Sequence, residues 1–236
     1  MLCFKNKRLM KKTERLSMIY VKNAAFTLAE VLITLLIVGV IASIVIPGLI
    51  QDSKNAELKA AYKKSFSDLS QATNRILQDN GGILTGLCPQ NDTTGATCWK
   101  NQYKSYLSVV KECENGKNIG NCWPDMGGGK GAKYFDGTEY AAYTNWWSYN
   151  AGLVLNNGTS LAFLGSSGGV CDKNYTSASR CFHFWVDVNG IKPPNTFGKD
   201  VFYLQVNANR LYPVIGFGEA CSGEGFNCAT SYLKDN

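Results

Sequence analysis

The chain has 236 residues, with 24 lysines and arginines against 18 aspartates and glutamates, which gives a formal net charge of +6. Residues 1–25 hold seven of the basic residues and one of the acidic ones, which leaves 17 of each sign in residues 26–236. The part after residue 25 therefore lacks the overall basic charge that drives nucleic-acid binding by counterion release. We do not expect a nucleic acid to be a partner.

A membrane-length apolar segment occupies residues 26–50, in which Glu30 is the one charged side chain. As a helix, residues 31–50 alone span about 30 Å, the thickness of a bilayer core. A carboxylate in such a helix is costly, which makes Glu30 a candidate functional residue. The positive-inside rule predicts a cytoplasmic N-terminus and an exported remainder. The basic residues that precede the segment are Lys5, Lys7, Arg8, Lys11, Lys12, Arg15 and Lys22.

The small residues of a cleavage site lie before the apolar segment, at Ala24 and Ala25, whereas an ordinary secretory signal carries them after it. With Phe26, Leu28 and Glu30 following, this order resembles the class III signal of type IV pilins and type II secretion pseudopilins. Ala25 departs from the family pattern, in which glycine is usual at that place. A plain signal anchor is the alternative, because a short motif is a hypothesis until its context agrees.

The resemblance implies that a prepilin peptidase removes residues 1–25 by cutting between Ala25 and Phe26, and methylates the new amine. The apolar helix then stays in the mature protein. The resemblance also implies that Glu30 neutralises this amine on a neighbouring subunit during assembly. Two charges that are each costly in an apolar bundle become tolerable as a pair.

Two further residues of the apolar segment fit the resemblance. Gly39 and Pro47 fall where the family helix commonly carries a glycine and a helix-bending proline. Pro47 lacks an amide hydrogen, so we expect it to loosen the helix and let it curve within a bundle. Met10 and Met18 are alternative start sites to Met1, and a start at either would shorten the leader.

The function that the resemblance implies is structural and non-catalytic. We expect a subunit of a type IV pilus or a type II secretion pseudopilus, which crosses the inner membrane once and carries its head outside the cytoplasm. The expected partners are the prepilin peptidase, other pilin or pseudopilin subunits, an inner-membrane assembly platform and a cytoplasmic ATPase. The alternative is a membrane-tethered adhesin-like or DNA-uptake pilin whose head binds a ligand.

An amphipathic helix is expected to continue the apolar segment through residues 51–82. Apolar residues recur there at three- and four-residue steps and define one stripe, which we expect to pack on a globular head. Residues 80–82, Asn-Gly-Gly, form a C-terminal stop signal. The stripe consists of Leu58, Tyr62, Phe66, Leu69, Thr73 and Ile76.

Residues 83–236 are predicted to form one β-rich head outside the cytoplasm. Asn156-Asn157-Gly158 between two short apolar runs is a hairpin signal, and an antiparallel meander is the economical arrangement. The predicted fold class is α+β, a pilin-like fold in which a long transmembrane and amphipathic helix packs on a small antiparallel sheet with disulfide-bearing loops. The predicted strands are residues 153–155, 160–164, 182–188, 201–206 and 210–212.

Eight cysteines of the head occur as neighbouring couples, and each couple brackets a loop. An even number of cysteines in an exported domain indicates disulfides, although the pairing rests on proximity alone. A zinc site is the alternative, but the chain has no CxxC motif and only His183 to assist. The expected pairs are Cys88 with Cys98, Cys113 with Cys122, Cys171 with Cys181, and Cys221 with Cys228.

Two motifs resemble catalytic loops. Residues 165–169 match GxSxG, with Asp172 and His183 following in hydrolase order. A nucleophile elbow needs a strand, a turn and a helix in a parallel sheet, whereas this segment is a glycine-rich loop that leaves a hairpin. Residues 127–131 resemble a phosphate loop but lack the Ser or Thr after the lysine. His183 alternates with phenylalanines in a predicted strand, so we expect it to be structural.

Two groups of residues are candidates for ligand binding. Asp187, Asn189 and Asp200 flank one loop, and its D-x-N-G start resembles part of a calcium loop, which supplies oxygen ligands over a short turn. The full EF-hand spacing and its closing glutamate are missing, and Asx turns are the alternative. A cluster of aromatic residues could stack sugars or bases, with packing as the alternative. Its members are Tyr140, Tyr143, Trp146, Trp147 and Tyr149.

Overall fold

The structure is a computed structural model of the chain, which divides into two compact units, residues 1–48 and 49–236. One long helix, α1, contributes to both units. The described residues are 26–90, 93–114, 116–125, 132–140, 151–164, 171–172, 174, 179–214 and 221–234.

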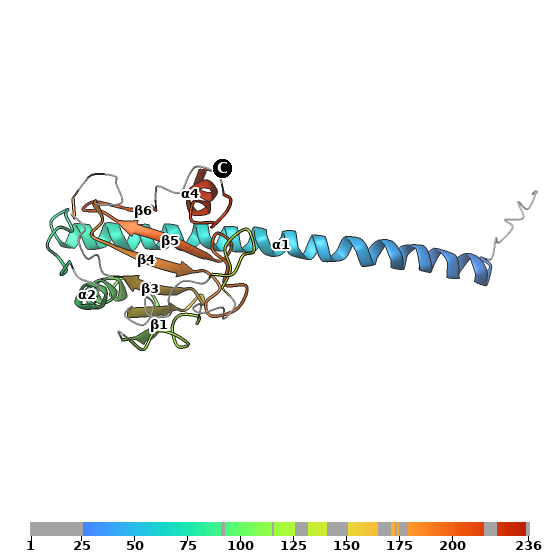
Figure 1. Ribbon diagram of the computed structural model, residues 1–236, viewed down its shortest axis with the longest axis horizontal. Helices are drawn as coiled ribbons and strands as arrows, with labels where there is room; N and C mark the ends of the chain where they lie inside the picture. Colours follow the sequence, from blue (N-terminus) through green and yellow to red (C-terminus); the bar gives the residue numbers. More distant parts are fainter. Residues whose placement is uncertain are drawn as a thin grey trace, which may run out of the picture. The chain divides into compact units, whose positions relative to one another are not determined.

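Helix α1 spans Leu28–Asp79 and is 52 residues long (Figure 1). It continues through Pro47, whose missing amide hydrogen removes one bond of the helical ladder. Four residues earlier, the Ser43 hydroxyl donates to the Val40 carbonyl at 2.7 Å. The proline thus interrupts the hydrogen bonding of α1 without ending the helix.

Helix α1 ends at the place that the Asn-Gly-Gly stop signal predicted. Gly81 has φ +70°, the left-handed conformation that glycine adopts without steric cost. The Gly82 N–H then donates to the Leu77 carbonyl at 2.7 Å, and the Asn80 N–H donates to the Ile76 carbonyl at 3.1 Å. This arrangement has the long-range bond of a Schellman motif and satisfies carbonyls that the helix end would leave open.

Six strands form one antiparallel sheet in the order β1-β2-β3-β4-β5-β6, so every chain neighbour is also a sheet neighbour (Figure 1). The expected meander is therefore confirmed. The β2–β3 hairpin turns at residues 156–158, where Gly158 has φ +88°. The strands are β1 Val109–Cys113, β2 Ala151–Leu155, β3 Ser160–Leu164, β4 Phe182–Asp187, β5 Val201–Val206 and β6 Leu211–Pro213.

The two faces of the sheet carry separate cores. One face packs against the stripe of α1 and against helix α2, Thr93–Lys104, and Tyr62 of α1 stacks on Phe202 of β5 with ring centroids 3.9 Å apart. The other face is covered by loop residues such as Trp123 and Phe197, which pack with Trp185 of β4. Leu58 and Phe66 of the stripe are partly buried. The other four residues of the stripe are completely buried: Tyr62, Leu69, Thr73 and Ile76.

Within the described part of the chain, three elements were not predicted from the sequence patterns. Helix α2 has two threonines and a glycine in its first three residues, which are weak helix formers, so it lacked a clear signal. Strand β1 lies at the edge of the sheet and exposes three consecutive residues, so it lacks the apolar alternation of a half-buried strand. A short helix, α4 Cys228–Lys234, contacts β5. Strand β4 also ends at Asp187, one residue before the predicted end.

Candidate functional site

The first turn of α1 contains the charged group of the apolar segment, the Glu30 carboxylate. Its Oε2 accepts hydrogen bonds from the Thr27 backbone N–H and from the Thr27 hydroxyl, both at 2.8 Å. The Glu30 N–H donates in return to the Thr27 hydroxyl oxygen at 3.2 Å. Thr27 and Glu30 thus form a capping box. The T-x-x-E pattern is the sequence signal for this motif, which the predicted role of Glu30 in assembly did not include.

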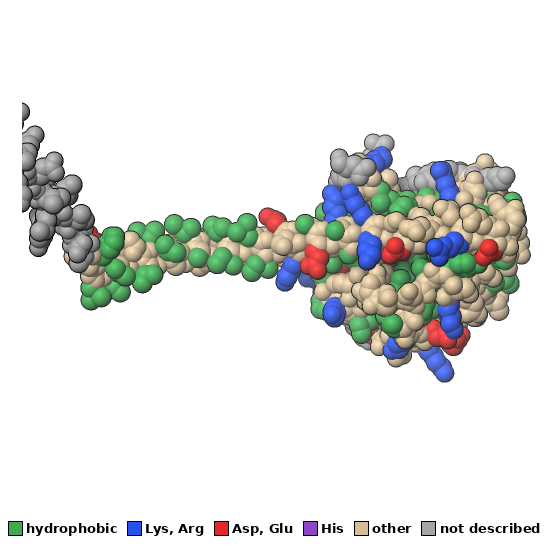
Figure 2. Space-filling model, turned by 180° about the vertical axis from the view of Figure 1, so that it is seen from behind, with side chains coloured by type: hydrophobic (Ala, Val, Ile, Leu, Met, Phe, Trp, Pro, Cys, Tyr) green, Lys and Arg blue, Asp and Glu red, His purple; other side chains and the backbone are tan. Residues whose placement is uncertain are grey.

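The apolar segment that follows is exposed along its length, and hydrophobic side chains cover it in Figure 2. Phe26 is 83% exposed and Leu36 68% exposed. Among the described residues, α1 is the one helix long and apolar enough to cross a membrane, and none of its most apolar stretch is buried within the chain. The core helix of a soluble protein would be covered by its own fold, so this surface requires a lipid or protein environment.

The other sequence-predicted residues of the segment lie in or next to this exposed helix. A Cβ atom on Gly39 would meet no atom within 4 Å, so the glycine leaves an open notch on the helix surface. Pro47 is likewise exposed. Ala25, the residue before the expected cleavage point, lies outside the described residues.

Four disulfides join the couples that proximity suggested. They are Cys88–Cys98, Cys113–Cys122, Cys171–Cys181 and Cys221–Cys228. Disulfides persist in oxidising environments outside the cytoplasm. Together with the exposed apolar helix, they indicate a membrane-anchored protein whose head is extracytoplasmic.

The loop between β4 and β5 brings together the three residues proposed as calcium ligands. The backbone N–H of Val188, next to Asp187, donates to the Asp200 carbonyl at 2.9 Å. Asp187 and Asp200 are both completely buried, and the Asn189 side-chain amide donates to the Pro193 carbonyl at 3.2 Å. The Asp200 carboxylate accepts the backbone N–H groups of Asn195 at 2.8 Å and Thr196 at 2.6 Å.

Burial dominates the electrostatics of this loop. It raises the pKa of Asp187 well above its ordinary value, and the neighbouring charge of Asp200 raises it further. Burial also raises the pKa of Asp200, against the opposing effect of its backbone hydrogen bonds. Within the described ranges, no three His, Cys, Asp or Glu side chains gather as a metal site. A cation in this loop would therefore depend on two carboxylates and on amide, backbone or water oxygens.

Several candidates from the sequence fall partly or wholly outside the described residues. The GxSxG segment, the glycine-rich 127–131 segment and four of the five clustered aromatic residues are among them. Tyr140, the fifth, is buried and packs on Phe197 at a centroid distance of 4.8 Å. His183 lies in β4 with its ring 5.3 Å from that of Tyr203. Burial, and then the charge of Arg180, lower the pKa of His183 to about 3.

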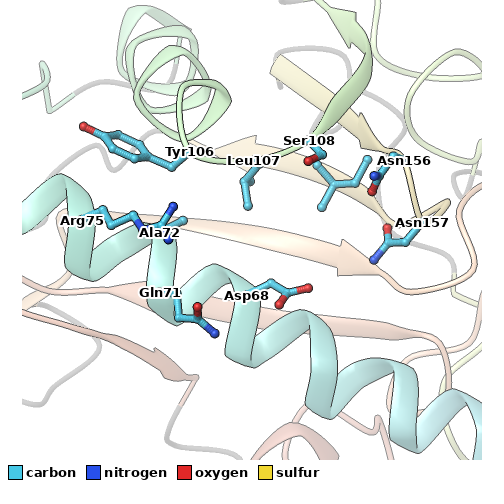
Figure 3. Close-up of a pocket in the computed structure, with 10 residues that line it drawn as sticks. Asp68, Gln71, Ala72, Arg75, Tyr106, Leu107, Ser108, Asn156 and Asn157 are labelled. Carbon is cyan, nitrogen blue, oxygen red and sulfur yellow. The ribbon is translucent and has the colours of Figure 1, made fainter.

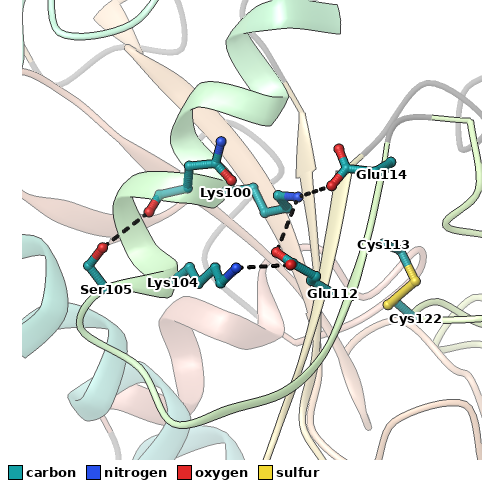
Figure 4. Close-up of polar contacts among 8 residues, drawn as sticks. Lys100, Lys104, Ser105, Glu112, Cys113, Glu114 and Cys122 are labelled. Atoms are coloured by element: carbon teal, nitrogen blue, oxygen red, sulfur yellow. Dashed lines mark hydrogen bonds and ion pairs between the residues drawn. A yellow bond between two sulfur atoms is a disulfide. The ribbon is translucent and has the colours of Figure 1, made fainter.

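An ion-pair cluster joins α2 to β1, and no sequence pattern had singled it out (Figure 4). Lys100 is buried, yet its Nζ lies 2.8 Å from Glu114 and 3.6 Å from Glu112. Lys104 reaches the same Glu112 at 2.9 Å. The glutamates keep 41% and 63% of their side chains exposed, so water shares in solvating the negative partners. The cluster fixes a helix against an edge strand.

A polar groove lies between α1, the segment before β1 and the β2–β3 turn (Figure 3). Asp68 and Arg75 line it from α1, and Asn156 and Asn157 line it from the turn. Tyr106, at its far end, donates its hydroxyl to the Asp79 carboxylate. The groove offers hydrogen-bonding groups of both kinds on the surface of the head.

No family model, curated protein or solved structure matches this chain. A long apolar helix leads into an antiparallel sheet with four disulfides, which is a pilin-like arrangement.

Proposed function

We propose that the chain is a non-catalytic subunit of a type IV pilus or a type II secretion pseudopilus. The observation that carries this proposal is the exposed apolar part of α1, whose one charged residue, Glu30, lies in its first turn. The capping box with Thr27 gives Glu30 a use in any helix, but a cap does not need a charge, and a charge at membrane depth is costly. A subunit that must be placed in register against its neighbours can use this charge to neutralise an opposite charge on another subunit.

The proposed mechanism begins with insertion of the helix, with the N-terminus in the cytoplasm and the head outside. A prepilin peptidase then cuts between Ala25 and Phe26, which leaves a positive amine on Phe26. When subunits associate through residues 26–50, Glu30 of one subunit neutralises the amine of another. The pair is tolerated in an apolar bundle where either charge alone is costly. An assembly platform in the inner membrane and a cytoplasmic ATPase are the expected partners.

Two measurements test this function in cells that carry the full-length chain. The intact mass of membrane-extracted protein should correspond to a mature chain that begins at Phe26 with a methylated amine. The Glu30→Gln variant, compared at wild-type abundance, should be inserted and cut normally but yield few sheared filaments or cross-linked oligomers. An uncut leader, a mature chain that begins after residue 42, or undiminished assembly of the variant would contradict the proposal.

A membrane-tethered binding protein is the second candidate, and the polar groove between α1 and the β2–β3 turn favours it. Grooves with a few fixed polar groups are where proteins orient small ligands. This candidate shares the membrane helix and differs in needing no polymerisation. This candidate would be favoured over a filament role if cells with the wild-type chain yielded no filaments or cross-linked oligomers and the Glu30→Gln variant bound a ligand at the cell surface as well as the wild type.

A further inference from the structure

We propose that the head binds an anionic phospholipid of the membrane in which α1 is anchored, through a small pocket beside residues 55–58 of that helix. The bound group is the phosphate of the lipid. This site needs α1 to be a membrane anchor, but it does not depend on filament assembly. The pocket is lined by Asn55, Leu58, Phe135, Lys199 and Tyr232.

The pocket lies just beyond the apolar part of α1. Asn55 and Leu58 follow Ile50, the last residue of the apolar segment, by five and eight residues in the same helix. At 1.5 Å per residue, they lie about 8 and 12 Å further along its axis. The headgroup layers of a bilayer are about 5–8 Å thick, and the surface charge acts over a further Debye length of about 10 Å. A helix that crosses the apolar core therefore brings this pocket to the headgroups.

Two polar groups that line the pocket are available as hydrogen-bond donors. The Asn55 amide oxygen accepts the Gln51 amide at 3.1 Å, which leaves the N–H groups of Asn55 for a ligand. Lys199 contributes an ammonium group with three N–H donors, and no acidic side chain of the described residues forms a salt bridge with it. None of the described residues that line the pocket carries a carboxylate. The carboxylate of Asp136, next to Phe135 in the chain, is already bonded to Thr138. The pocket therefore matches an anion.

Two aromatic rings hold ammonium groups at the walls of the pocket. The Lys199 Nζ lies 5.6 Å from the centroid of the Phe135 ring. The Lys59 Nζ lies 4.9 Å from the centroid of the Tyr232 ring. Both rings line the pocket, and both distances are within the limit of about 6 Å for a cation–π contact. A lysine that is already held loses less conformational freedom on binding, so these contacts favour the capture of an anion.

The two rings are themselves fixed by the packing of the head. Tyr232 of α4 packs edge-on against Phe202 of β5, with ring centroids 6.0 Å apart. The Cβ of Phe135 lies close to Gly225, where an added Cβ would come within 2.8 Å of it. The glycine thus allows Phe135 to approach the backbone. Because both rings are held in place without a ligand, the pocket is preformed.

The size and the walls of the pocket favour a lipid over a soluble anion. Its volume is about 100 Å³, less than the roughly 300–1,000 Å³ of pockets that enclose a whole small molecule. It therefore has room for one group of a larger molecule. Leu58 and the two rings supply apolar walls, which suit the glycerol and first acyl carbons next to a lipid phosphate. Residues 51–64 hold four lysines against two acidic residues, and Figure 2 shows basic side chains where α1 enters the head. An anionic membrane surface attracts such a segment.

The experiment uses the full-length protein in detergent, mixed with equal amounts of phosphatidylglycerol and phosphatidylcholine. Native mass spectrometry counts the lipids that stay bound. Because each lysine near an anionic headgroup contributes about fivefold in affinity, the first bound lipid should be phosphatidylglycerol, by about twentyfold over phosphatidylcholine. Lys199→Gln should reduce this preference about fivefold, and the double variant Lys59→Gln/Lys199→Gln should abolish it. Lys199→Arg keeps the charge and should keep the preference.

Lys54→Gln is the matched control, because Lys54 is exposed, lies nearer to Ile50 than Lys59 does, and does not line the pocket. It should keep the wild-type preference. Glycerol 1-phosphate, the soluble headgroup, should not displace the lipid at millimolar concentration. The site is overturned by a wild type without preference, by a Lys54→Gln variant that loses as much as Lys199→Gln, by a Lys199→Arg variant that loses the preference, or by displacement with glycerol 1-phosphate. None of these results bears on Glu30 or on filament counts.

Discussion

Thr27 and Glu30 are bonded to each other within one chain, through a carboxylate that accepts both the backbone N–H and the hydroxyl of the threonine. Glu30 therefore has a local role in capping α1 before any neighbouring subunit is considered. Removing the side chain, as in Glu30→Ala, would abolish the cap and the charge together. An assembly defect in that variant would not show which of the two is needed.

A pair of variants separates the two roles. Glu30→Gln keeps an acceptor at the third helical position, as a capping box allows, but removes the charge. Thr27→Ala keeps the charge and removes the cap, at a cost of about 1 kcal/mol to the helix end. We expect Thr27→Ala to assemble near the wild-type level and Glu30→Gln to fail, as measured by sheared filaments per cell. The reverse order would assign Glu30 to capping alone.

The disulfides lead to a prediction about stability. Each encloses a short loop, with sequence separations of 7 to 10 residues. Chain-entropy arguments give about 2–3 kcal/mol for loops of this size. Replacing both cysteines of one couple by serine should lower the free energy of unfolding by that amount in denaturant titrations. Peptide mapping without reduction should recover the four local pairs, and free thiols in the purified protein would contradict them.

Replacing Cys221 and Cys228 by serine should lower the free energy of unfolding more than replacing any of the other couples. Cys228 begins α4, and the neighbouring Ala229 carbonyl accepts the Tyr62 hydroxyl of α1 at 3.1 Å. Tyr62 in turn stacks on Phe202. Losing this disulfide therefore loosens a buried contact as well as a loop. The Cys88–Cys98 double variant is the comparison, and equal losses in unfolding free energy would show that α4 adds nothing.

The Lys100 cluster yields a prediction that depends on where its partners lie. Because Glu112 and Glu114 are partly exposed, removing the lysine leaves no buried carboxylate without a partner. Lys100→Met keeps the aliphatic packing and should change the free energy of unfolding by less than about 1 kcal/mol. Lys100→Ala also opens a cavity and should cost about 2–3 kcal/mol. A Met variant as unstable as the Ala variant would show that the ion pairs, and not the packing, fix α2.

Much of the fold could be predicted because local signals and burial agreed. The Asn-Asn-Gly turn lies between two apolar runs, and the resulting β2–β3 hairpin has both strands buried. The three- and four-residue spacing from Leu58 to Ile76 predicted the packed face of α1. Helix α2 and strand β1 escaped prediction because they are stabilised by tertiary contacts, such as the stacking of Trp99 on Phe182 and the ion pairs of Lys100, and not by their own propensities or periodicity.

The candidate sites also differ in how far they could be predicted from the sequence. The Phe-Thr-Leu-Ala-Glu order is a local pattern, so both its resemblance to a processing signal and its capping box can be read from adjacent residues. Asp187 and Asp200 are 13 positions apart, and their burial depends on the pairing of β4 with β5. The sequence offered the residue types, but only the fold shows that both carboxylates are completely buried.

The final prediction concerns acid stability and His183, which is the only histidine of the chain. Its pKa is lowered to about 3 in the folded state, first by burial and then by the charge of Arg180, whereas an unfolded histidine titrates near 6.5. The unfolded state therefore binds more protons between these values. The stability that neutral His183 contributes is present above pH 6.5 and is lost as the pH falls toward 3. Through His183, acidification from pH 6.5 to 4.5 should lower the free energy of unfolding by roughly 2–3 kcal/mol.

The His183→Gln variant isolates this effect, because the other titrating groups are the same in both proteins and cancel in the difference. Free energies of unfolding should be measured by tryptophan fluorescence at pH 6.5 and 4.5, in buffers of the same ionic strength. We expect the wild type to lose more stability than the variant over this interval, by the amount given above. If the free energy of unfolding fell by the same amount in both proteins, protonation of His183 would not destabilise the folded head. A buried, neutral His183 against Tyr203 would then be wrong.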